Sequence, residues 1–151
     1  MNCENLPITA ASSDDLSDIL DLLSLVRLPH DGVAENISNF LVVRDESLKL
    51  IATIGLERYG NTGLLRSAAV APEYQECGIG SRLTEELLQR ATKDGVERIV
   101  LLTTTARDFF ARRFGFCDAS RTNFENDLAA SAEWNLPRCS SAACMSLELR
   151  K

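Results

Sequence analysis

The sequence predicts a mixed α/β domain in which helices cover a mostly antiparallel central sheet. Three strand-like segments follow one another through short turns between residues 39 and 72, which is typical of antiparallel hairpins. An amphipathic segment at residues 80–93 separates them from a nearly continuous apolar run at residues 96–105. Such a run is typical of a strand that is covered on both faces. The 151 residues suit a single domain, residues 1–151, with a core of its own.

Helical spacing of apolar residues marks residues 14–27, which follow a short predicted strand at residues 6–12. Pro29 and Gly32 are expected to end that helix. A short helical segment at residues 33–38 then leads into the three strands. Their predicted ranges are 39–45, 49–60 and 64–72.

The second half of the chain begins with the helix at residues 80–93. A second, shorter helix is predicted at residues 106–114, with Gly115 as its C-terminal cap. The apolar stripe of the first of these helices consists of Ile79, Leu83, Leu87 and Ala91. The remaining predicted elements are a strand from residues 116–120, a helix at 125–134 and a closing strand at 143–150.

Charge and hydropathy exclude several classes of partner. A net charge of −6 argues against nucleic acid, which requires a basic face. No apolar run approaches the roughly 20 residues that span a bilayer, so no membrane partner is expected. The N-terminus has neither a basic patch nor an apolar core, which argues against a secretory signal and for a cytoplasmic location. The oligomeric state is left open, with a homodimer as one option.

The five cysteines are scattered, and in a cytoplasmic protein they are expected to be reduced. Cys139 and Cys144 are near neighbours in the sequence, but neither a second pair nor a histidine cluster completes a zinc site. No metal site is therefore predicted, and a metalloid-sensing thiol pair is the minor alternative. The only histidine, His30, is interpreted as a surface residue rather than a catalytic imidazole.

Two glycines, Gly78 and Gly80, lie in the stretch QECGIG, where the third of these strands turns into a helix. The first amides of a helix lack internal partners and favour an anion, which glycines allow to approach closely. A dinucleotide fold would place its glycines after the first strand, with a third glycine. A P-loop would need Gly-Lys-Ser/Thr, but Ser81-Arg82 follows Gly80. The pyrophosphate of coenzyme A and a purely structural turn remain.

The stretch AAVAPEYQECGIGSRLTEELL is similar to the acyl-CoA-binding motif of the GNAT superfamily of N-acyltransferases. The matching residues are Val70, Pro72, Gln75, Gly78 and Gly80. FFARRFGF resembles a later motif of the same family. The resemblance implies acetyl-CoA as acyl donor, bound where the fourth and fifth strands splay apart. The residues that it assigns to coenzyme binding are Val70, Gln75, Glu76, Cys77, Gly78, Ile79, Gly80 and Ser81.

Two subgroups of the family are the most similar. LLTTTARDFF and SAEWNLPRCSSAACMSLEL resemble the acetyltransferase domain of bacterial N-acetylglutamate synthases. LPHDGVAENISNFLVV, GLERYG and LLRSAAVAP resemble the N-acetyltransferases associated with arsenic-resistance gene clusters. Both resemblances imply an N-acetyltransferase whose acceptor amine, attacking the thioester directly, belongs to a small amino acid or a glutamate-like compound.

Acyl transfer to an amine needs a base, and Glu57 in GLERYG is the candidate; the alternative is an exposed glutamate at a strand end. Arg66 lies inside an apolar strand and could grip a substrate carboxylate through two hydrogen bonds, or form an ion pair with a neighbouring helix. Thr103 and Thr104 end the fifth strand and could donate hydrogen bonds to substrate, although threonine also simply suits strands.

Two departures from the family pattern favour a second hypothesis. Many relatives carry a tyrosine that protonates the thiolate in the helix before the Gly-Phe pair, where this chain has Ala111. Water or Tyr59 is then left to supply the proton. Glu76 and Cys77 stand in the loop where relatives often carry a basic residue or glycine, and a carboxylate there opposes an anion unless it points to solvent. The alternative function is a non-catalytic acyl-CoA-binding or regulatory module.

Overall fold

A computed structural model describes residues 5–137 and 142–149 of the chain. Packing divides the chain into two compact units, and each is described by itself. The assignment of residues 1–151 to one domain stays a prediction. The first unit comprises Met1–Leu56 and Ser67–Gln89, and the second comprises Glu57–Arg66 and Arg90–Lys151.

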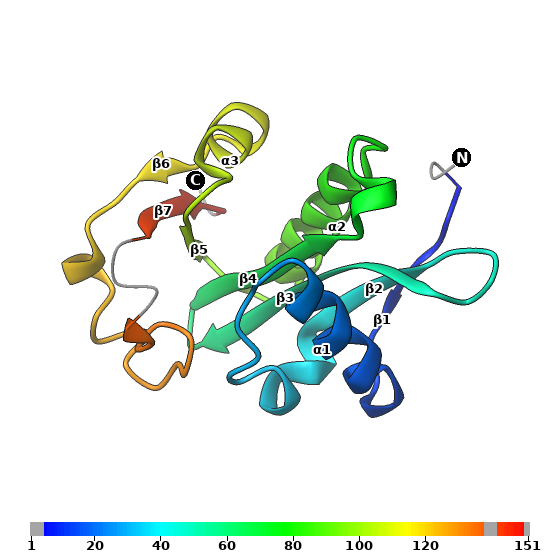
Figure 1. The fold of residues 1–151 in the computed structure, drawn as a ribbon. Helices are drawn as coiled ribbons and strands as arrows, with labels where there is room; N and C mark the ends of the chain where they lie inside the picture. The colour runs from blue at the N-terminus through cyan, green and yellow to red at the C-terminus, as the bar shows by residue number, and fades with distance from the viewer. Residues whose placement is uncertain (1–4, 138–141, 150–151) are drawn as a thin grey trace. The chain divides into compact units, whose positions relative to one another are not determined.

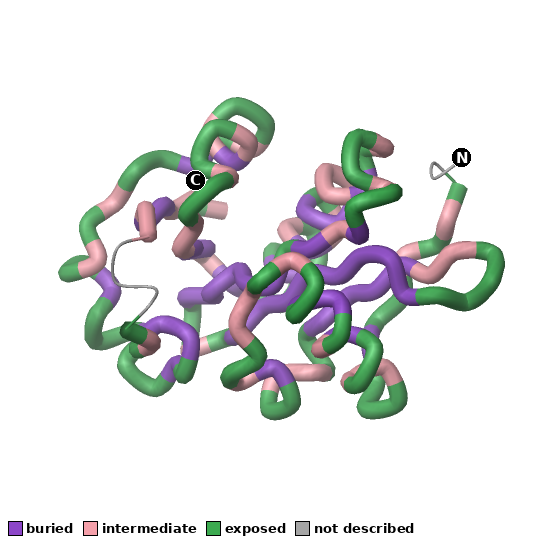
Figure 2. The backbone as a smooth tube through the Cα atoms, in the orientation of Figure 1, coloured by how far each residue is buried: buried purple, intermediate pink, exposed green. Residues whose placement is uncertain are grey.

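The first unit is built on antiparallel strands. Strand β1 (Ile8–Ala10) pairs with β2 (Phe40–Arg44), and β2 pairs with β3 (Leu50–Tyr59). The first eight residues of β3 are all buried. In Figure 1 helix α1 (Leu16–Leu25) lies in front of β2 and β3, and Figure 2 shows these strands as mostly buried. The strand therefore contributes both of its faces to the interior.

The helices of this unit begin close to their predicted positions. Helix α1 is preceded by a turn of 3₁₀ helix, Ser13–Asp15, so the α-helix itself is shorter than the predicted residues 14–27. Helix α2 (Ile79–Lys93) begins one residue before the predicted start. Its predicted apolar stripe is confirmed, because each of its four members is buried. These are Ile79, Leu83, Leu87 and Ala91.

An ion pair ties the start of α1 to strand β2. Arg44 Nη2 lies 2.7 Å from Asp15 Oδ1 and 3.0 Å from Asp18 Oδ2. The hydrogen bond from Arg44 is the main cause that lowers the pKa of Asp15 below its ordinary value of 3.8. Because both side chains of the Arg44–Asp15 pair are largely but not fully covered, the pair is expected to contribute at most about 1 kcal/mol.

We expect Asp15→Asn to lower the unfolding free energy by up to about 1 kcal/mol near neutral pH, with the difference vanishing in acid. The pKa of Asp15 is lower in the folded than in the unfolded chain, so its contribution is present above the ordinary value of 3.8 and is lost as the pH falls through the folded value. Urea denaturation over a pH series measures the unfolding free energy of the parent chain and of Asp15→Asn. A difference that stays constant into acid would contradict the ion pair as the cause.

The second unit contains the only parallel strand pair of the described ladders. Strand β4 (Thr62–Val70) pairs in parallel with β5 (Arg98–Thr103). The paired residues end at Leu65 and Leu101, although both strands continue beyond them. This early end of the ladder agrees with the predicted splay of the fourth and fifth strands.

Antiparallel partners cover the other edge of β5. Strand β7 (Ala143–Glu148) pairs with β5 along its whole length, and β6 (Cys117–Asp118) pairs with β7. Helix α3 (Arg107–Phe114) ends at Gly115, whose φ of 77° is the left-handed conformation of a C-terminal cap. The predicted cap at Gly115 is therefore confirmed.

The predicted helix at residues 125–134 is wrong: the backbone there forms a series of turns. Side chains compete for its backbone groups, since Ser131 Oγ accepts the N–H of Trp134 and Asn135 Nδ2 donates to two carbonyls. Trp134, 1% exposed, anchors the segment in an apolar cluster. The other buried members of this cluster are Leu64, Val100, Phe124, Leu128 and Cys144.

The hydrogen-bonded strand order is β1-β2-β3-β4-β5-β7-β6. Most described pairs are antiparallel, and helices flank the strands. The predicted fold class, a mixed and mostly antiparallel sheet covered by helices, is confirmed.

Candidate active site

The glycine loop belongs to the first unit and leads directly into the N-terminus of α2. Among the described backbone bonds, the first of the helical pattern joins the N–H of Arg82 to the carbonyl of Gly78 at 3.2 Å. The amides of Ile79, Gly80 and Ser81 therefore precede the helical ladder and have no intrahelical acceptor. The dipole of the 15-residue helix adds partial positive charge at the same place. This end of α2 suits a phosphate group.

The backbone requires a glycine at Gly78 but not at Gly80. Gly78 has a φ of 83°, which L side chains rarely adopt. At Gly80 an added Cβ would meet only Val70 Cγ2, at an ordinary 3.8 Å. The fold leaves room for a small side chain at Gly80, so the glycine there is better explained by close approach of a ligand.

The remaining loop residues differ in exposure. Glu76 is exposed, with a φ of 74°, which meets the condition that its carboxylate should reach solvent. Ile79 is 1% exposed and anchors α2 in the core, while Ser81 is half-buried. Cys77 is disulfide-bonded, so the expectation of reduced cysteines is wrong at this position.

The carbonyl of Val70, at the end of β4, already has a partner. Gln75 Nε2 donates a hydrogen bond to Val70 O at 3.0 Å. Further back in β4, Ser67 has a φ of 59°, which interrupts the regular alternation of the strand. Simple alternation of side chains therefore does not relate the face of Arg66 to that of Val70.

Glu57 and Arg66 lie together in the second unit. Arg66 Nη1 donates to Glu57 Oε2 at 2.7 Å, and the two side chains are 0% and 1% exposed. Glu57 is thus not the exposed strand-end glutamate of the alternative interpretation. Arg66 does form an ion pair, but with a carboxylate from the neighbouring strand β3 rather than from a helix. Its grip on a substrate carboxylate stays a prediction.

Sequence reasoning missed Glu133, which also faces Arg66. Glu133 Oε1 lies 3.7 Å from Arg66 Nε, and the Glu133 side chain is 8% exposed. The segment that carries it was expected to be a helix, which gave no reason to single out one glutamate. The available signal was its position in SAEW, between small and aromatic residues. A carboxylate in such a setting needs a buried partner.

Tyr59 completes this group. Its hydroxyl donates to Glu57 Oε1 at 2.5 Å, so both oxygens of Glu57 are engaged. Burial and then the hydrogen bond to Glu57 raise the pKa of Tyr59 to about 12. Tyr59 therefore stays protonated at neutral pH and acts as a hydrogen-bond donor.

The threonines at the end of β5 have different surroundings. Thr103 Oγ1 accepts the N–H of Ala106, the residue immediately before α3, at 2.9 Å. Thr104 is exposed. Thr103 thus has a structural role at the start of α3, and hydrogen bonds from either threonine to substrate stay a prediction.

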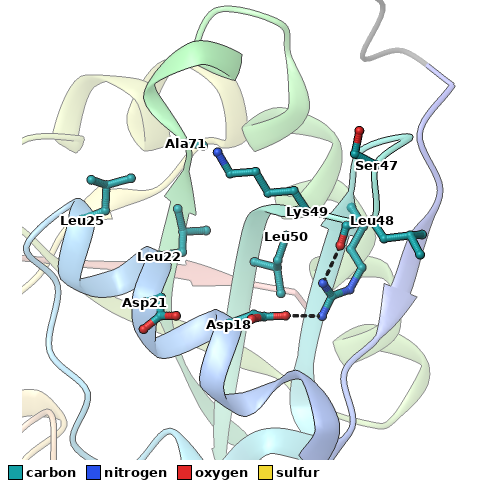
Figure 3. Close-up of a pocket in the computed structure, with 10 residues that line it drawn as sticks. Asp18, Asp21, Leu22, Leu25, Ser47, Leu48, Lys49, Leu50 and Ala71 are labelled. Carbon is teal, nitrogen blue, oxygen red and sulfur yellow. Dashed lines mark hydrogen bonds and ion pairs between the residues drawn. The ribbon is translucent and has the colours of Figure 1, made fainter.

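A pocket of about 350 Å³ lies in the first unit, between α1 and the turn from β2 to β3 (Figure 3). Arg44 reaches Asp18 and the carbonyl of Leu48 across it. None of the predicted site residues line this pocket. Its lining residues are Asp18, Asp21, Leu22, Leu25, Arg44, Ser47, Leu48, Lys49, Leu50 and Ala71.

The metal, cysteine and histidine candidates of the sequence have the following surroundings within the part of the chain that the structure describes. Within residues 5–137 and 142–149, no three metal-ligating side chains gather as a metal site would require. Cys144 is buried, which raises the pKa of its thiol, and Cys139 lies outside the described residues. His30 is exposed and pairs with Ser24 Oγ. No described helix has the length and hydropathy to cross a membrane.

Curated proteins similar to this chain are amino-acid acetyltransferases. The protein of Pseudomonas fluorescens strain Pf0-1 is 31% identical over 115 residues, which cover 70% of this chain and 26% of the relative. That of Pseudomonas putida strain GB-1 matches with the same identity and coverage. The chain thus spans about a quarter of the length of the curated relatives that it matches.

Solved structures share the fold over nearly the whole chain. N-acetylglutamate synthase from Neisseria gonorrhoeae, complexed with coenzyme A and L-arginine, is 25% identical with a TM-score of 0.78, covering 97% of this chain and 34% of that one. A Mycobacterium tuberculosis protein in complex with CoA and NLQ is 23% identical with a TM-score of 0.76, covering 94% and 98%. This second likeness shows the fold alone.

The match to a family model agrees with both comparisons. It spans residues 13–116, which include the helix α1, the glycine loop and the Gly115-Phe116 pair. More than half of the chain therefore matches the model described as the acetyltransferase (GNAT) family. The resemblance inferred from the motif around Gly78 and Gly80 is confirmed, and the chain belongs to the acetyltransferase (GNAT) family.

Proposed function

We propose that this chain transfers the acetyl group of acetyl-CoA to the amine of a small amino acid or glutamate-like compound, by direct attack. The observation that carries the proposal is the N-terminus of α2, where the amides of Ile79, Gly80 and Ser81 precede the helical ladder and the fold itself does not require a glycine at Gly80. The amino-acid acetyltransferases among its relatives support the acceptor class.

The residues of the loop suit the diphosphate of coenzyme A. Of the loop amides from Gln75 to Ser81, those of Ile79 to Ser81 are the ones that would hold it, because the amides of Gln75 and Cys77 already donate to carbonyls within the turn. The side chain of Gln75 must release the carbonyl of Val70 if that carbonyl is to bond the pantetheine arm. Glu76 is exposed, so solvent screens the repulsion between its carboxylate and a bound diphosphate. The cofactor assignment thus depends on backbone groups more than on side-chain charge.

The second unit supplies the groups for proton transfer. The acceptor nitrogen attacks the thioester carbonyl, the carbon–sulfur bond breaks, and the nitrogen loses a proton as the thiolate gains one. We assign Glu57 as the base that accepts the proton lost by the acceptor nitrogen. The proton passes through a water molecule, because both carboxylate oxygens of Glu57 are already hydrogen-bonded. Water is assigned as the donor to the thiolate, because Ala111 replaces the family's tyrosine and Tyr59 already donates to Glu57.

A non-catalytic acyl-CoA-binding module is the second candidate, favoured by Ala111 and by the burial of both Glu57 and Arg66. A location in the cytoplasm and a link to arsenic resistance, with a glutamate-like compound as acceptor, extend the first candidate. The location rests on the composition of the N-terminus, and the link to arsenic resistance rests on the sequence resemblance.

We expect the purified chain, given acetyl-CoA and a panel of amino acids including glutamate, to release one free thiol per acetylated amine, at about 1 s⁻¹ or faster for its preferred acceptor. A thiol reagent follows the release, and mass spectrometry identifies the product. Melting temperatures with and without acetyl-CoA form the control. Stabilisation by acetyl-CoA with no turnover across the panel would favour the binding module, and neither effect would contradict both candidates.

A further inference from the structure

Two leucines of the first unit are exposed beside the same pocket. Leu25, the last residue of α1, is 61% exposed, and Leu48, in the turn between β2 and β3, is 74% exposed. Among the described residues they are the only large hydrophobic side chains that are exposed. Figure 3 shows them on opposite sides of the pocket that both of them line. Single exposed leucines are common on protein surfaces, but two that border one pocket form a patch.

The pocket continues this patch toward the core. Leu22 and Leu50 line it and are only 5% and 6% exposed. The apolar lining therefore runs from α1 across the start of β3 to the turn (Figure 3). We call Leu22, Leu25, Leu48 and Leu50 the leucine surface.

Leu48 adopts a backbone conformation that leucine disfavours. Its φ of 68° lies in the left-handed region, where hairpin turns usually carry glycine or asparagine. A turn that only joined two strands would be more stable with one of those residues at this position. Leucine here combines an unfavourable φ with an exposed apolar side chain. A contact outside the chain explains both.

Hydrogen bonds hold the turn that carries Leu48 in a fixed shape. Asp45 Oδ1 accepts the N–H groups of Ser47 and Lys49, at 2.9 and 3.0 Å. The N–H of Leu48 donates to the carbonyl of Asp45 at 2.9 Å, and Arg44 Nη1 donates to the carbonyl of Leu48 at 2.8 Å. The turn is thus organised before any partner binds, which reduces the entropy that a contact with Leu48 would lose.

Charges of opposite sign border the leucine surface on its two sides. Asp21 lies on α1, and Lys49 lies on the turn (Figure 3). Lys49 Nζ is 3.2 Å from Glu73 Oε2, but these side chains are 62% and 48% exposed, so their ion pair is weak. A two-fold axis through this surface would bring the acidic side of one copy against the basic side of another, twice. The surface therefore complements itself, as an isologous contact requires.

We propose that the leucine surface is the contact between two copies of this chain, with α1 of each copy against the turn between β2 and β3 of the other. Leu48 of each copy is then covered by leucines of its partner, and Lys49 of each copy pairs with the partner's Asp21. A patch that carries both an acidic and a basic side fits a second copy better than a partner of one charge. No residue of the glycine loop lines the pocket, so the contact does not depend on the proposed function.

The test is Leu48→Asn, compared with the parent chain by sedimentation velocity over a range of concentrations. We expect the parent to be dimeric at about 100 µM and the variant to dimerise about a hundredfold more weakly, because each dimer buries the Leu48 side chain twice. Asparagine adopts a positive φ more readily than leucine, so in dilute, monomeric samples the melting temperature of Leu48→Asn should equal or exceed that of the parent. A weaker dimer made of an equally stable monomer separates a lost contact from a damaged fold.

Glu76→Asn is the matched control, because Glu76 is also exposed with a positive φ in the same unit but does not line the pocket. It should leave the dissociation constant of the dimer within about threefold. Non-reducing electrophoresis detects dimers that are instead linked through Cys117, which is free and exposed. A parent chain that stays monomeric at about 100 µM, or a dimer that Leu48→Asn does not weaken, would overturn the proposal.

Two charge variants test which sides of the surface meet. In a homodimer of Asp21→Lys two positive charges oppose each other at both ends of the contact, and in a homodimer of Lys49→Asp two negative charges do, so each variant alone should dimerise at least about tenfold more weakly. An equimolar mixture restores one opposite-charge pair at each end and should recover the affinity of the parent. A mixture that associates no better than the single variants would overturn the pairing of α1 with the turn.

Discussion

Replacing Arg66 with alanine is expected to lower the unfolding free energy by about 3–5 kcal/mol, the largest effect of any single change in the second unit's ion pairs. The side chain is fully buried between Glu57 and Glu133. Its removal leaves the buried carboxylate of Glu57 without the guanidinium that it pairs with, which costs far more than the intact pair contributes. Urea denaturation of the parent chain and of Arg66→Ala measures the difference in unfolding free energy.

Arg98→Ala is the matched control, because it also removes an arginine from a strand of the same unit. Arg98 Nε lies 2.7 Å from Glu148 Oε2, but the two side chains are 35% and 56% exposed. Water replaces the lost contacts there, so the expected cost is no more than about 1 kcal/mol. Equal costs for the two variants would contradict the buried charge as the cause.

Arg66→Lys, which keeps the charge and loses the planar fork, is the variant in which a kinetic role can be measured. If Arg66 also binds a substrate carboxylate, the KM of the acceptor should rise far more than the KM of acetyl-CoA. Equal changes in the two KM values would contradict a role of Arg66 in binding the acceptor. Its role would then be limited to the ion pair with Glu57.

We expect Gly80→Asp to weaken coenzyme A binding about a hundredfold while the chain folds normally. An added Cβ at Gly80 meets only Val70 Cγ2 at 3.8 Å, so the fold accepts the side chain. An acidic residue in the first turn of a helix is itself favourable to the helix dipole. The same carboxylate would stand where the amides of Ile79 to Ser81 are proposed to hold a diphosphate, and like charges repel.

Gly80→Asn separates charge from size, because the two side chains have nearly the same shape. Calorimetric titration with coenzyme A is expected to show a loss of about tenfold for Asn, so that the remaining loss in Asp reports the charge. Unchanged melting temperatures without ligand confirm that both variants fold. Binding of coenzyme A by Gly80→Asp within about threefold of the parent would contradict the loop as the diphosphate site.

The elements with strong local signals were predicted from the sequence alone. The helix that begins at Ile79 has a four-residue apolar stripe and a glycine loop before it, and the structure places it within one residue of its predicted start. Gly115 ends α3 in the left-handed conformation that its position after a basic turn indicates. Local hydrogen bonding and side-chain spacing suffice for such elements, because their main determinants lie within a few residues.

The turns at residues 125–137 could not be predicted in this way. Their residues have helical composition, yet Ser131 and Asn135 bond the backbone locally, and Trp134 is drawn into a core built from distant strands. The burial of Trp134 outweighs a weak helix propensity. Tertiary packing therefore decided the backbone of this segment.

The sequence by itself determined the family and the position of α2 behind its glycine loop, and it singled out Glu57 and Arg66 as candidate residues. Only the tertiary structure decided that these two are paired, that Tyr59 holds the other oxygen of Glu57, and that Glu133 shares Arg66. The physical reason is the distance along the chain between a residue and the residues that determine its structure. A loop and a helix terminus are specified by neighbouring residues, whereas the partner of a buried charge is specified by whichever segment the core brings against it.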